Sequence, residues 1–248
     1  MSTRETVQSV TRAVAIIEAV VSEGGIVSLK TIAEKTGLAA ATVHRLASTL
    51  VETGLLRQAP GREYVLAPTL MWAGGAAQLV TKRWAVPILQ QVVDATGETA
   101  NLAAREGDKI VYLAQVPSPY SMRMFTEVGR RVDPHCTAVG KALLANREDA
   151  EVRKLLERTG MRRYTSSTIT SPDEFIAELD TVRKNGFAGD ESEQEEGVRC
   201  VAVSHGSGRS AIAISVSGPE ARFTYDKREG AAQTIASAIA ASPFLPPD

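Results

Sequence analysis

The stretch from Ser28 to Gly54, SLKTIAEKTGLAAATVHRLASTLVETG, constrains the fold of this chain most strongly. Its apolar residues recur at helical spacing on both sides of Gly37, so two short helices can turn their apolar faces onto one shared core. Gly37 can adopt the positive φ of a tight turn, and Ala33 is small enough for a second helix to cross close above it. The spacing therefore predicts a helix-turn-helix whose second helix runs from about Ala40 to Thr53.

The second helix of this pair carries polar side chains that the shared core does not need. In a DNA-binding unit, the early residues of such a helix enter the major groove. The segment that follows, LLRQAPGREYVL, has two short apolar runs around Pro60-Gly61 and predicts a β-hairpin, which forms a wing beside the recognition helix. Arginines on the wing, and an arginine in a helical pattern before this motif, can hold the phosphate backbone. The predicted DNA-binding residues are Arg12, Thr42, His44, Arg45, Ser48, Arg57 and Arg62.

A short helix-turn-helix pattern also fits a plain helical hairpin inside a larger helical core, and the wing favours the DNA-binding interpretation. A further helix is expected before the motif, from about Ser9, which can cap it, to Glu23. Its apolar stripe is wider than one small domain needs, so part of the stripe is expected to contact another subunit. Residues 1–82 carry 8 Lys+Arg against 6 Asp+Glu. So few positive charges give weak phosphate binding per copy, which favours a dimer or a larger assembly.

The composition is that of a globular protein with a substantial core. The chain has 248 residues and 44% hydrophobic residues, which suits two domains. It has no apolar run of the roughly 20 residues that cross a bilayer, and its N-terminus lacks the features of a signal peptide. These observations predict a cytoplasmic protein without a membrane partner. Cys136 and Cys200 are the two cysteines, too few for a disulfide framework.

Three parts are expected along the chain: a DNA-binding domain over 1–68, an apolar linker helix over 69–84 that contains Gly74-Gly75, and a second domain over 85–248. The second domain is expected to open with a helix over 85–96. Pairs of strand patterns then mix with helical patterns without regular βαβ alternation, which predicts an α+β fold with an antiparallel sheet flanked by helices. The strands are expected over 99–104, 109–116, 120–127, 187–191, 200–204 and 210–217, and the helices over 137–145, 149–159, 171–185 and 230–241.

Two stretches of the second domain are candidates for a ligand site. Thr137 is a predicted N-cap at a helix start rich in small residues, where free backbone N–H groups can receive a carboxylate. Ser215 and Ser217 lie on one face of their strand by the two-residue period. If the serine face meets the helix start, hydroxyls and amides converge inside an apolar cavity. An ordinary capped helix and a solvent-exposed serine face are the alternatives.

Other chemistry is weakly indicated by the sequence. Asp133, His135 and Cys136 offer the residue types of nucleophilic catalysis, but neighbouring residues rarely aim at one another and no nucleophile elbow is present. A small-carboxylate enzyme with Cys136 as nucleophile is therefore the alternative function. His135, His205 and the two cysteines lack metal-ligand spacing, so a metal or redox sensor is a further alternative. We expect no catalytic residue, no metal and no cofactor.

The chain resembles the IclR-type transcriptional regulators over nearly its whole length. The resemblance rests on motifs that occur in this order: SVTRAVAIIEAV, TIAEKTGL, TVHRLASTLVETGLL, GREYVLAPTL, ETANLAAREGDKIVYLAQV, GRRVDPHCTAVGKALLA, DESEQEEGVRCVAV and ISVSGP. It implies a winged helix-turn-helix domain, a linker helix and a GAF-like effector domain. Such proteins bind double-stranded operator DNA as homodimers or tetramers and respond to a small organic acid, either as repressors or as activators.

The resemblance also implies the residues of an effector pocket. Two departures from the family pattern affect the sites. Ala39, Ala40 and Ala41 stand before Thr42 where the family usually has Pro-Lys/Arg-Ser, and Ser204 stands where proline is common. The three alanines remove polar groups from the start of the recognition helix, so base reading is left to Thr42, His44 and Arg45. Ser204 changes the local strand geometry at the wall of the implied pocket. The implied effector residues are Met124, Val132, Ala138, Val139, Asp190, Val198, Cys200, Ser215 and Ser217.

Overall fold

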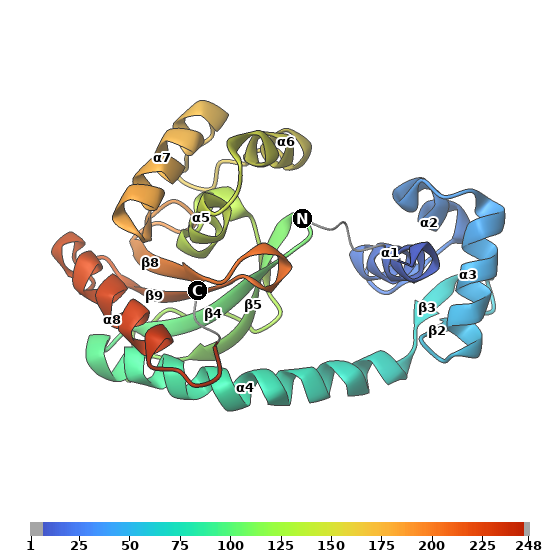
Figure 1. The fold of residues 1–248 in the computed structure, drawn as a ribbon, viewed down its shortest axis with the longest axis horizontal. Helices are drawn as coiled ribbons and strands as arrows, with labels where there is room; N and C mark the ends of the chain where they lie inside the picture. Colours follow the sequence, from blue (N-terminus) through green and yellow to red (C-terminus); the bar gives the residue numbers. More distant parts are fainter. Residues whose placement is uncertain (1–6, 246–248) are drawn as a thin grey trace. The chain divides into compact units, whose positions relative to one another are not determined.

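The computed structural model describes residues 7–245, which form two compact units that divide between Leu79 and Val80. The first unit contains three complete helices, the first part of a fourth, and a small antiparallel sheet with the strand order β1-β3-β2 (Figure 1). Its elements are α1 (Gln8–Ser22), β1 (Ile26–Val27), α2 (Leu29–Thr36), α3 (Ala40–Glu52), β2 (Leu56–Gln58) and β3 (Tyr64–Leu66). The predicted helix-turn-helix and its wing are therefore present.

Local chemistry explains how the first unit folds. Gly37 adopts φ 66° between α2 and α3, as the tight turn requires. The Ser28 hydroxyl caps α2 by accepting the backbone N–H of Thr31 at 3.2 Å. The prediction that Ser9 caps α1 is wrong, because α1 begins one residue earlier, after Val7, and no side chain caps it. Strand β1 was not predicted, because two residues are too few to display an alternating pattern.

Helix α4 (Pro68–Thr96) is a single helix, whereas the sequence suggested a weak linker helix followed by a separate one. It contains Gly74, Gly75 and Pro87 without ending at any of them. A Cβ added at either glycine would meet no atom within 4 Å, so both glycines lie on an open stretch of the helix. Glycine lowers helix stability by roughly 1 kcal/mol but does not forbid the helix, which is why the pattern underestimated its length.

The second unit is built on a six-stranded antiparallel sheet with the order β6-β5-β4-β9-β8-β7, which confirms the predicted α+β class. Its strands are β4 (Thr99–Glu106), β5 (Lys109–Val116), β6 (Arg131–Val132), β7 (Ala188–Glu191), β8 (Val198–His205) and β9 (Ile212–Pro219). Its α-helices are α5 (Ala138–Ala145), α6 (Asp149–Thr159), α7 (Pro172–Asn185) and α8 (Arg228–Ala240). Short 3₁₀ turns occupy Pro134–Cys136, Gly208–Ser210 and Tyr225–Lys227.

The sheet separates two apolar clusters. Helices α5, α6 and α7 cover one face, and α8 with the C-terminal half of α4 covers the other (Figure 1). Successive side chains of β9 point to opposite faces of the sheet, so this strand contributes to both clusters. Ala213 packs toward α5, whereas Ile214 and Val216 pack toward α4 and α8. The face toward α5 is the one on which Ser215 and Ser217 lie.

The strand predicted over 120–127 is wrong, because this segment is a loop before β6. Side chains take the carbonyl groups that a neighbouring strand would otherwise use. Arg222 donates to the Met122 carbonyl at 2.9 Å, and Thr99 Oγ1 donates to the Met124 carbonyl at 3.0 Å. The Arg222 guanidinium also lies 4.4 Å from the centre of the Tyr120 ring. Alternating residues alone cannot reveal such competing partners.

Candidate functional site

Helix α3 has one buried and one open face. Val43, Ala47 and Leu50 are buried in the core of the first unit. His44 and Arg45 are exposed, whereas Thr42 and Ser48 are partly exposed. The helix therefore presents its polar residues to solvent, as a recognition helix must, and this disposition argues against a plain hairpin inside a larger core.

The predicted arginines outside α3 are also accessible. Arg57 is exposed on β2, and Arg62 is exposed at the tip of the hairpin between β2 and β3. Arg62 adopts φ 63°, a left-handed backbone that non-glycine residues rarely adopt. Arg12 is partly exposed on α1. All three arginines belong to the first unit, and their guanidinium groups are accessible to a DNA backbone.

The second candidate site consists of two neighbouring rows of residues across the central sheet. In antiparallel pairs, residues directly opposite one another share a face of the sheet. The first row runs through Asp190, Cys200, Ser217 and Thr99, and the second through Ala202, Ser215, Asn101 and Gln115. Four strands in each row thus bring polar side chains together from distant parts of the chain.

The serine face of β9 is buried. Ser215 is 2% exposed and Ser217 is 6% exposed, so the solvent-exposed alternative is wrong. Asn101 Nδ2 lies 3.4 Å from Ser215 Oγ and 3.5 Å from Ser217 Oγ. Gln115 Nε2 donates to Asn101 Oδ1 at 3.0 Å. A connected polar network therefore crosses β5, β4 and β9.

Helix α5 starts above this face and contacts β7, β8, β9 and β4. Thr137 is its N-cap, as predicted, and its hydroxyl accepts the backbone N–H of Gly140 at 3.2 Å. Gly140 lets the helix approach the preceding turn, because an added Cβ would lie 2.2 Å from the Pro134 carbonyl oxygen. Ala138 and Val139 are buried in the same apolar cluster as Val132. This arrangement places small apolar residues and free helix N–H groups beside the polar rows.

Asp190 is a buried carboxyl in the first row. Burial raises its pKa to about 7, although the backbone N–H of Glu193, which donates to Asp190 Oδ1 at 2.7 Å, acts in the opposite direction. The charge of Glu193 raises the pKa of Asp190 further, and Lys141 lowers it. Asp190 therefore titrates near neutral pH, and its charge depends on its neighbours.

Met124 and Val198 complete the predicted set. The Met124 carbonyl accepts from Thr99 in the first row, so the loop before β6 is attached to this part of the sheet. Val198 is buried on β8 and shares the face of Cys200 by the two-residue period. Cys200 packs against the apolar cluster yet stays partly accessible to solvent. Tyr112, which packs there too, is also partly accessible.

Sequence reasoning missed four residues of this face: Thr99, Asn101, Tyr112 and Gln115. They lie on β4 and β5, more than 95 positions before β9, and only strand pairing brings them to the serines. A weak signal was present, since an asparagine amid the apolar residues of a buried strand needs a partner. The sequence did not indicate which partner.

Comparison with known proteins identifies the family. The chain matches the model of the IclR helix-turn-helix domain over residues 9–60 and that of the bacterial transcriptional regulator IclR C-terminal domain over residues 77–242. It is 32% identical over 228 residues to the transcriptional repressor IclR of Escherichia coli, a match that covers 89% of this chain and 83% of the relative. The protein belongs to the IclR family.

Other IclR proteins agree in sequence and fold. The probable transcriptional regulator SauR of Cupriavidus necator is 37% identical over 230 residues, covering 88% of this chain and 89% of that protein. The Thermotoga maritima IclR structure superposes with a TM-score of 0.63 at 29% identity, covering 93% and 95% of the two chains. An IclR homologue from Microbacterium hydrocarbonoxydans, solved with 4-hydroxybenzoate, shares the fold with a TM-score of 0.60 at 21% identity, covering 95% and 100%.

The IclR proteins are DNA-binding transcriptional regulators rather than enzymes, so the alternative of Cys136 as a nucleophile is wrong. The site chemistry agrees with this conclusion. Cys136 is fully buried, and burial raises the pKa of its thiol to about 12. His135 Nε2 pairs with the Arg162 carbonyl at 2.9 Å, and Asp133 is engaged by Lys109 and Tyr164. A thiolate is therefore disfavoured, and these pairings do not form a catalytic relay.

The metal-sensor alternative has no support from side-chain positions. Across residues 7–245, no group of three or more His, Cys, Asp or Glu side chains is arranged to hold a metal ion. Cys136 and Cys200 are both free thiols. Within the same range, none of the helices combines the length and the apolar character that a membrane span needs.

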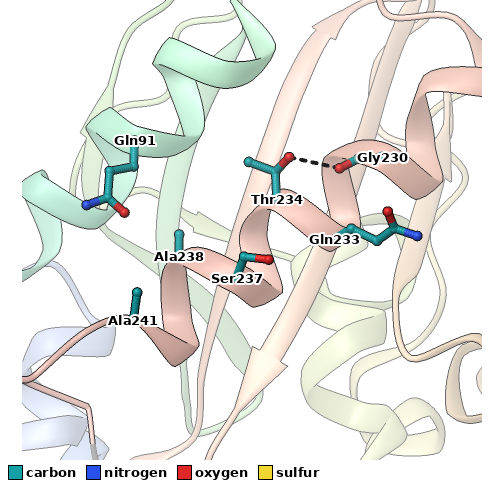
Figure 2. Close-up of a pocket in the computed structure, with 7 residues that line it drawn as sticks. All are labelled: Gln91, Gly230, Gln233, Thr234, Ser237, Ala238 and Ala241. Carbon is teal, nitrogen blue, oxygen red and sulfur yellow. Dashed lines mark hydrogen bonds between the residues drawn. The ribbon is translucent and has the colours of Figure 1, made fainter.

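A groove lies between α4 and α8, on the face of the six-stranded sheet opposite Ser215 and Ser217 (Figure 2). Figure 2 shows Thr234 bonded to the Gly230 carbonyl of its own helix, at 2.9 Å. None of the predicted effector residues lines this groove, and its lining contains no charged side chain. The lining residues are Gln91, Gly230, Gln233, Thr234, Ser237, Ala238 and Ala241. This groove therefore offers no cationic side chain to an organic acid.

Proposed function

We propose that this IclR-family regulator binds a small carboxylate-bearing metabolite between the start of α5 and the two polar rows of the sheet. The observation that carries the proposal is the buried serine pair on β9. Two hydroxyl groups that share a buried face with Asn101 are unnecessary for packing, and they can receive ligand oxygens. The N–H groups at the start of α5 add the positive end of a helix dipole.

The remainder of the proposed pocket is apolar. Val132, Ala138 and Val139 belong to one buried cluster, so the ligand would combine a carboxylate with a hydrocarbon or aromatic body. Met124 and Val198 would contribute further apolar contacts, and Asp190 and Cys200 would lie beside the polar end. The 4-hydroxybenzoate bound by the Microbacterium homologue has this combination of groups.

The proposed DNA contacts come from the exposed side of the first unit. Arg45, Thr42 and His44 would reach base edges or nearby phosphates, with Ser48 beside them on α3. Arg12, Arg57 and Arg62 would hold the backbone of the operator. Because three alanines precede Thr42, few polar groups enter the groove from the helix start, and Arg45 would therefore carry much of the specificity.

We propose that the protein acts as a homodimer or a tetramer. Its α1 helix leaves Val10, Val14 and Val21 exposed, although Ile16 and Val20 are buried. Met71 and Trp72 on α4 are 80% and 77% exposed. Large apolar side chains gathered in this way mark protein contacts. Two copies would also double the number of phosphate contacts, which the small positive charge of one copy requires. The assembly would work in the cytoplasm.

Effector and operator would be coupled through two states of the dimer. A ligand shifts the balance between the states only by the difference between its affinities for them. An effector that prefers the state with the lower operator affinity weakens operator binding, and one that prefers the other state strengthens it. Both modes use the same two sites.

A gel-shift assay on promoter fragments beside the protein's own gene tests the DNA-binding site. Arg45→Ala should abolish specific retention, because it removes the exposed guanidinium at the centre of α3. Arg130→Ala, which changes an exposed arginine of the second unit, is the matched control and should retain the fragment. Equal retention by wild type and Arg45→Ala would disprove the assigned role of α3.

Thermal shift with four acids tests the ligand site: benzoate, 4-hydroxybenzoate, propionate and succinate. At least one acid should raise the melting temperature of the wild type, and Ser217→Ala should reduce that increase. Gln233→Ala, in the groove between α4 and α8, should leave it unchanged. A ligand-induced increase that Gln233→Ala removes and Ser217→Ala preserves would move the site to the groove.

A further inference from the structure

The orientation of one buried amide decides what the serine pair can bind. Asn101 is 0% exposed, and its side chain has two different ends. Gln115 Nε2 lies 3.0 Å from Asn101 Oδ1, so this oxygen is an acceptor that Gln115 already occupies. The amide nitrogen of Asn101 must then face the opposite way, toward Ser215 and Ser217, and can only donate.

Each serine oxygen therefore receives a hydrogen from Asn101. The distances are 3.4 Å to Ser215 Oγ and 3.5 Å to Ser217 Oγ, at the long end for hydrogen bonds, and the NH₂ group has one hydrogen for each hydroxyl. A serine that accepts from Asn101 cannot direct its own hydrogen at the same nitrogen. Asn101 therefore leaves both hydroxyl hydrogens free to point toward a different acceptor.

The groups beside Ser217 compete only weakly for its hydrogen. Thr99, opposite Ser217, is engaged twice, since its hydroxyl donates to the Met124 carbonyl at 3.0 Å and accepts the Ser118 N–H at 3.1 Å. Cys200 also lies opposite Ser217 and bonds its hydroxyl. Burial raises the pKa of the Cys200 thiol well above its usual range, so the sulfur is uncharged and a weak acceptor.

We infer that Asn101, held in place by Gln115, is a positioning residue that makes Ser215 and Ser217 hydrogen-bond donors toward a ligand oxyanion. This inference rests on the proposed ligand site and specifies how that site selects its ligand. Two converging O–H donors match the two oxygens of a carboxylate. An amide ligand would bring N–H donors to the same point and would pair with them less well. The site therefore selects acids over the corresponding amides.

The test reverses the polarity of the amide with little change of shape. In Asn101→Asp, a carboxylate replaces the amide, so the serine hydroxyls would donate to the introduced carboxylate and present lone pairs to the ligand. Gln115→Met removes the bond that fixes the amide and adds no charge. Gln91→Met, on an exposed face of α4, is the matched control. Calorimetry measures the affinity of each variant for benzoate, 4-hydroxybenzoate, propionate and succinate, and for the amide of each acid.

The wild type and Gln91→Met should bind at least one acid more tightly than its amide. Asn101→Asp should lower the acid-to-amide affinity ratio at least about tenfold, and Gln115→Met should lower it about fivefold, as expected for one lost hydrogen bond of about 1 kcal/mol. Melting temperatures without ligand show whether each variant is folded. Because the carboxylate of Asn101→Asp would also repel an acid directly, Gln115→Met, which adds no charge, decides the result.

The outcomes separate this inference from the proposed function. If the wild type binds an acid and both variants keep its acid-to-amide ratio, the assigned role of Asn101 is overturned while the ligand site stands. A uniform loss of affinity for acid and amide alike also overturns it, since that result indicates a structural role. If the wild type binds none of the four acids, the proposed function fails, and the inference fails with it.

Discussion

Lys141 Nζ lies 2.5 Å from Glu193 Oε1, and both side chains are buried, one on α5 and the other after β7. The ammonium also donates to the Gly189 carbonyl at 3.0 Å and lies 3.3 Å from Glu178 Oε1. Glu193 in turn donates its backbone N–H to Asp190. One cation therefore fixes the segment that positions the buried carboxyl of the proposed ligand site.

Lys141→Met should be strongly destabilising, because it leaves the buried carboxylate of Glu193 without its cation. We expect the free energy of unfolding to fall by about 3–5 kcal/mol, measured by urea denaturation. Adding Glu193→Gln should recover part of the loss, since no buried charge is then unpaired. Lys154→Met, at an exposed position on α6, should change stability by less than about 0.5 kcal/mol. Similar values for the two lysine variants would contradict this role of Lys141.

Asp190 should make stability depend on pH in a defined direction. Its pKa is about 7 in the folded protein and near 3.8 when unperturbed, so the folded state retains a proton that the unfolded chain has released. Wild-type stability should therefore fall, relative to Asp190→Asn, as the pH rises from about 4 to 7, by an amount on the order of a few kcal/mol. Urea denaturation of both proteins across this range measures the difference. A constant difference would show that Asp190 titrates normally.

Alanine substitutions at two helical glycines, Gly140 and Gly230, should change the free energy of unfolding in opposite directions. Gly140→Ala places a Cβ 2.2 Å from the Pro134 carbonyl oxygen, a backbone atom that cannot move aside cheaply. We expect a loss of about 3 kcal/mol or more in unfolding free energy. Gly230→Ala on α8 meets no atom within 4 Å and should be neutral or stabilising by about 0.5–1 kcal/mol. A tolerated Gly140→Ala would mean that α5 does not press on the preceding turn.

Arg62→Gly should separate stability from DNA affinity. Glycine adopts the φ of 63° at this position without steric cost, so the unfolding free energy should rise by about 1 kcal/mol. The loss of the guanidinium should weaken binding to all DNA sequences and reduce the slope of log affinity against log salt by about 1. Arg57→Ala should lower affinity without the gain in stability. An unchanged salt slope in Arg62→Gly would remove this arginine from the phosphate contacts.

Local signals in the sequence predicted much of the fold. Gly37 and Thr137 marked a turn and a helix start through chemistry that acts within a few residues, and both are where the pattern placed them. The serine face of β9 followed from a two-residue period. Its neighbours did not, because Asn101 meets Ser215 only through the pairing of β4 with β9. The loop at 120–127 was mistaken for a strand for the same reason, since its Met122 carbonyl pairs with Arg222, a residue distant in the sequence.

The two faces of the sheet in the second unit carry different kinds of side chains. Ile214 and Val216 pack with α4 and α8, while Ser215 and Ser217, between and after them on the same strand, face α5. Substitutions at alternate positions of β9 can thus retune recognition without disturbing the aliphatic layer on the reverse side. Related proteins can therefore come to recognise different effectors through a few substitutions on the ligand-facing side of β9, while the fold is retained.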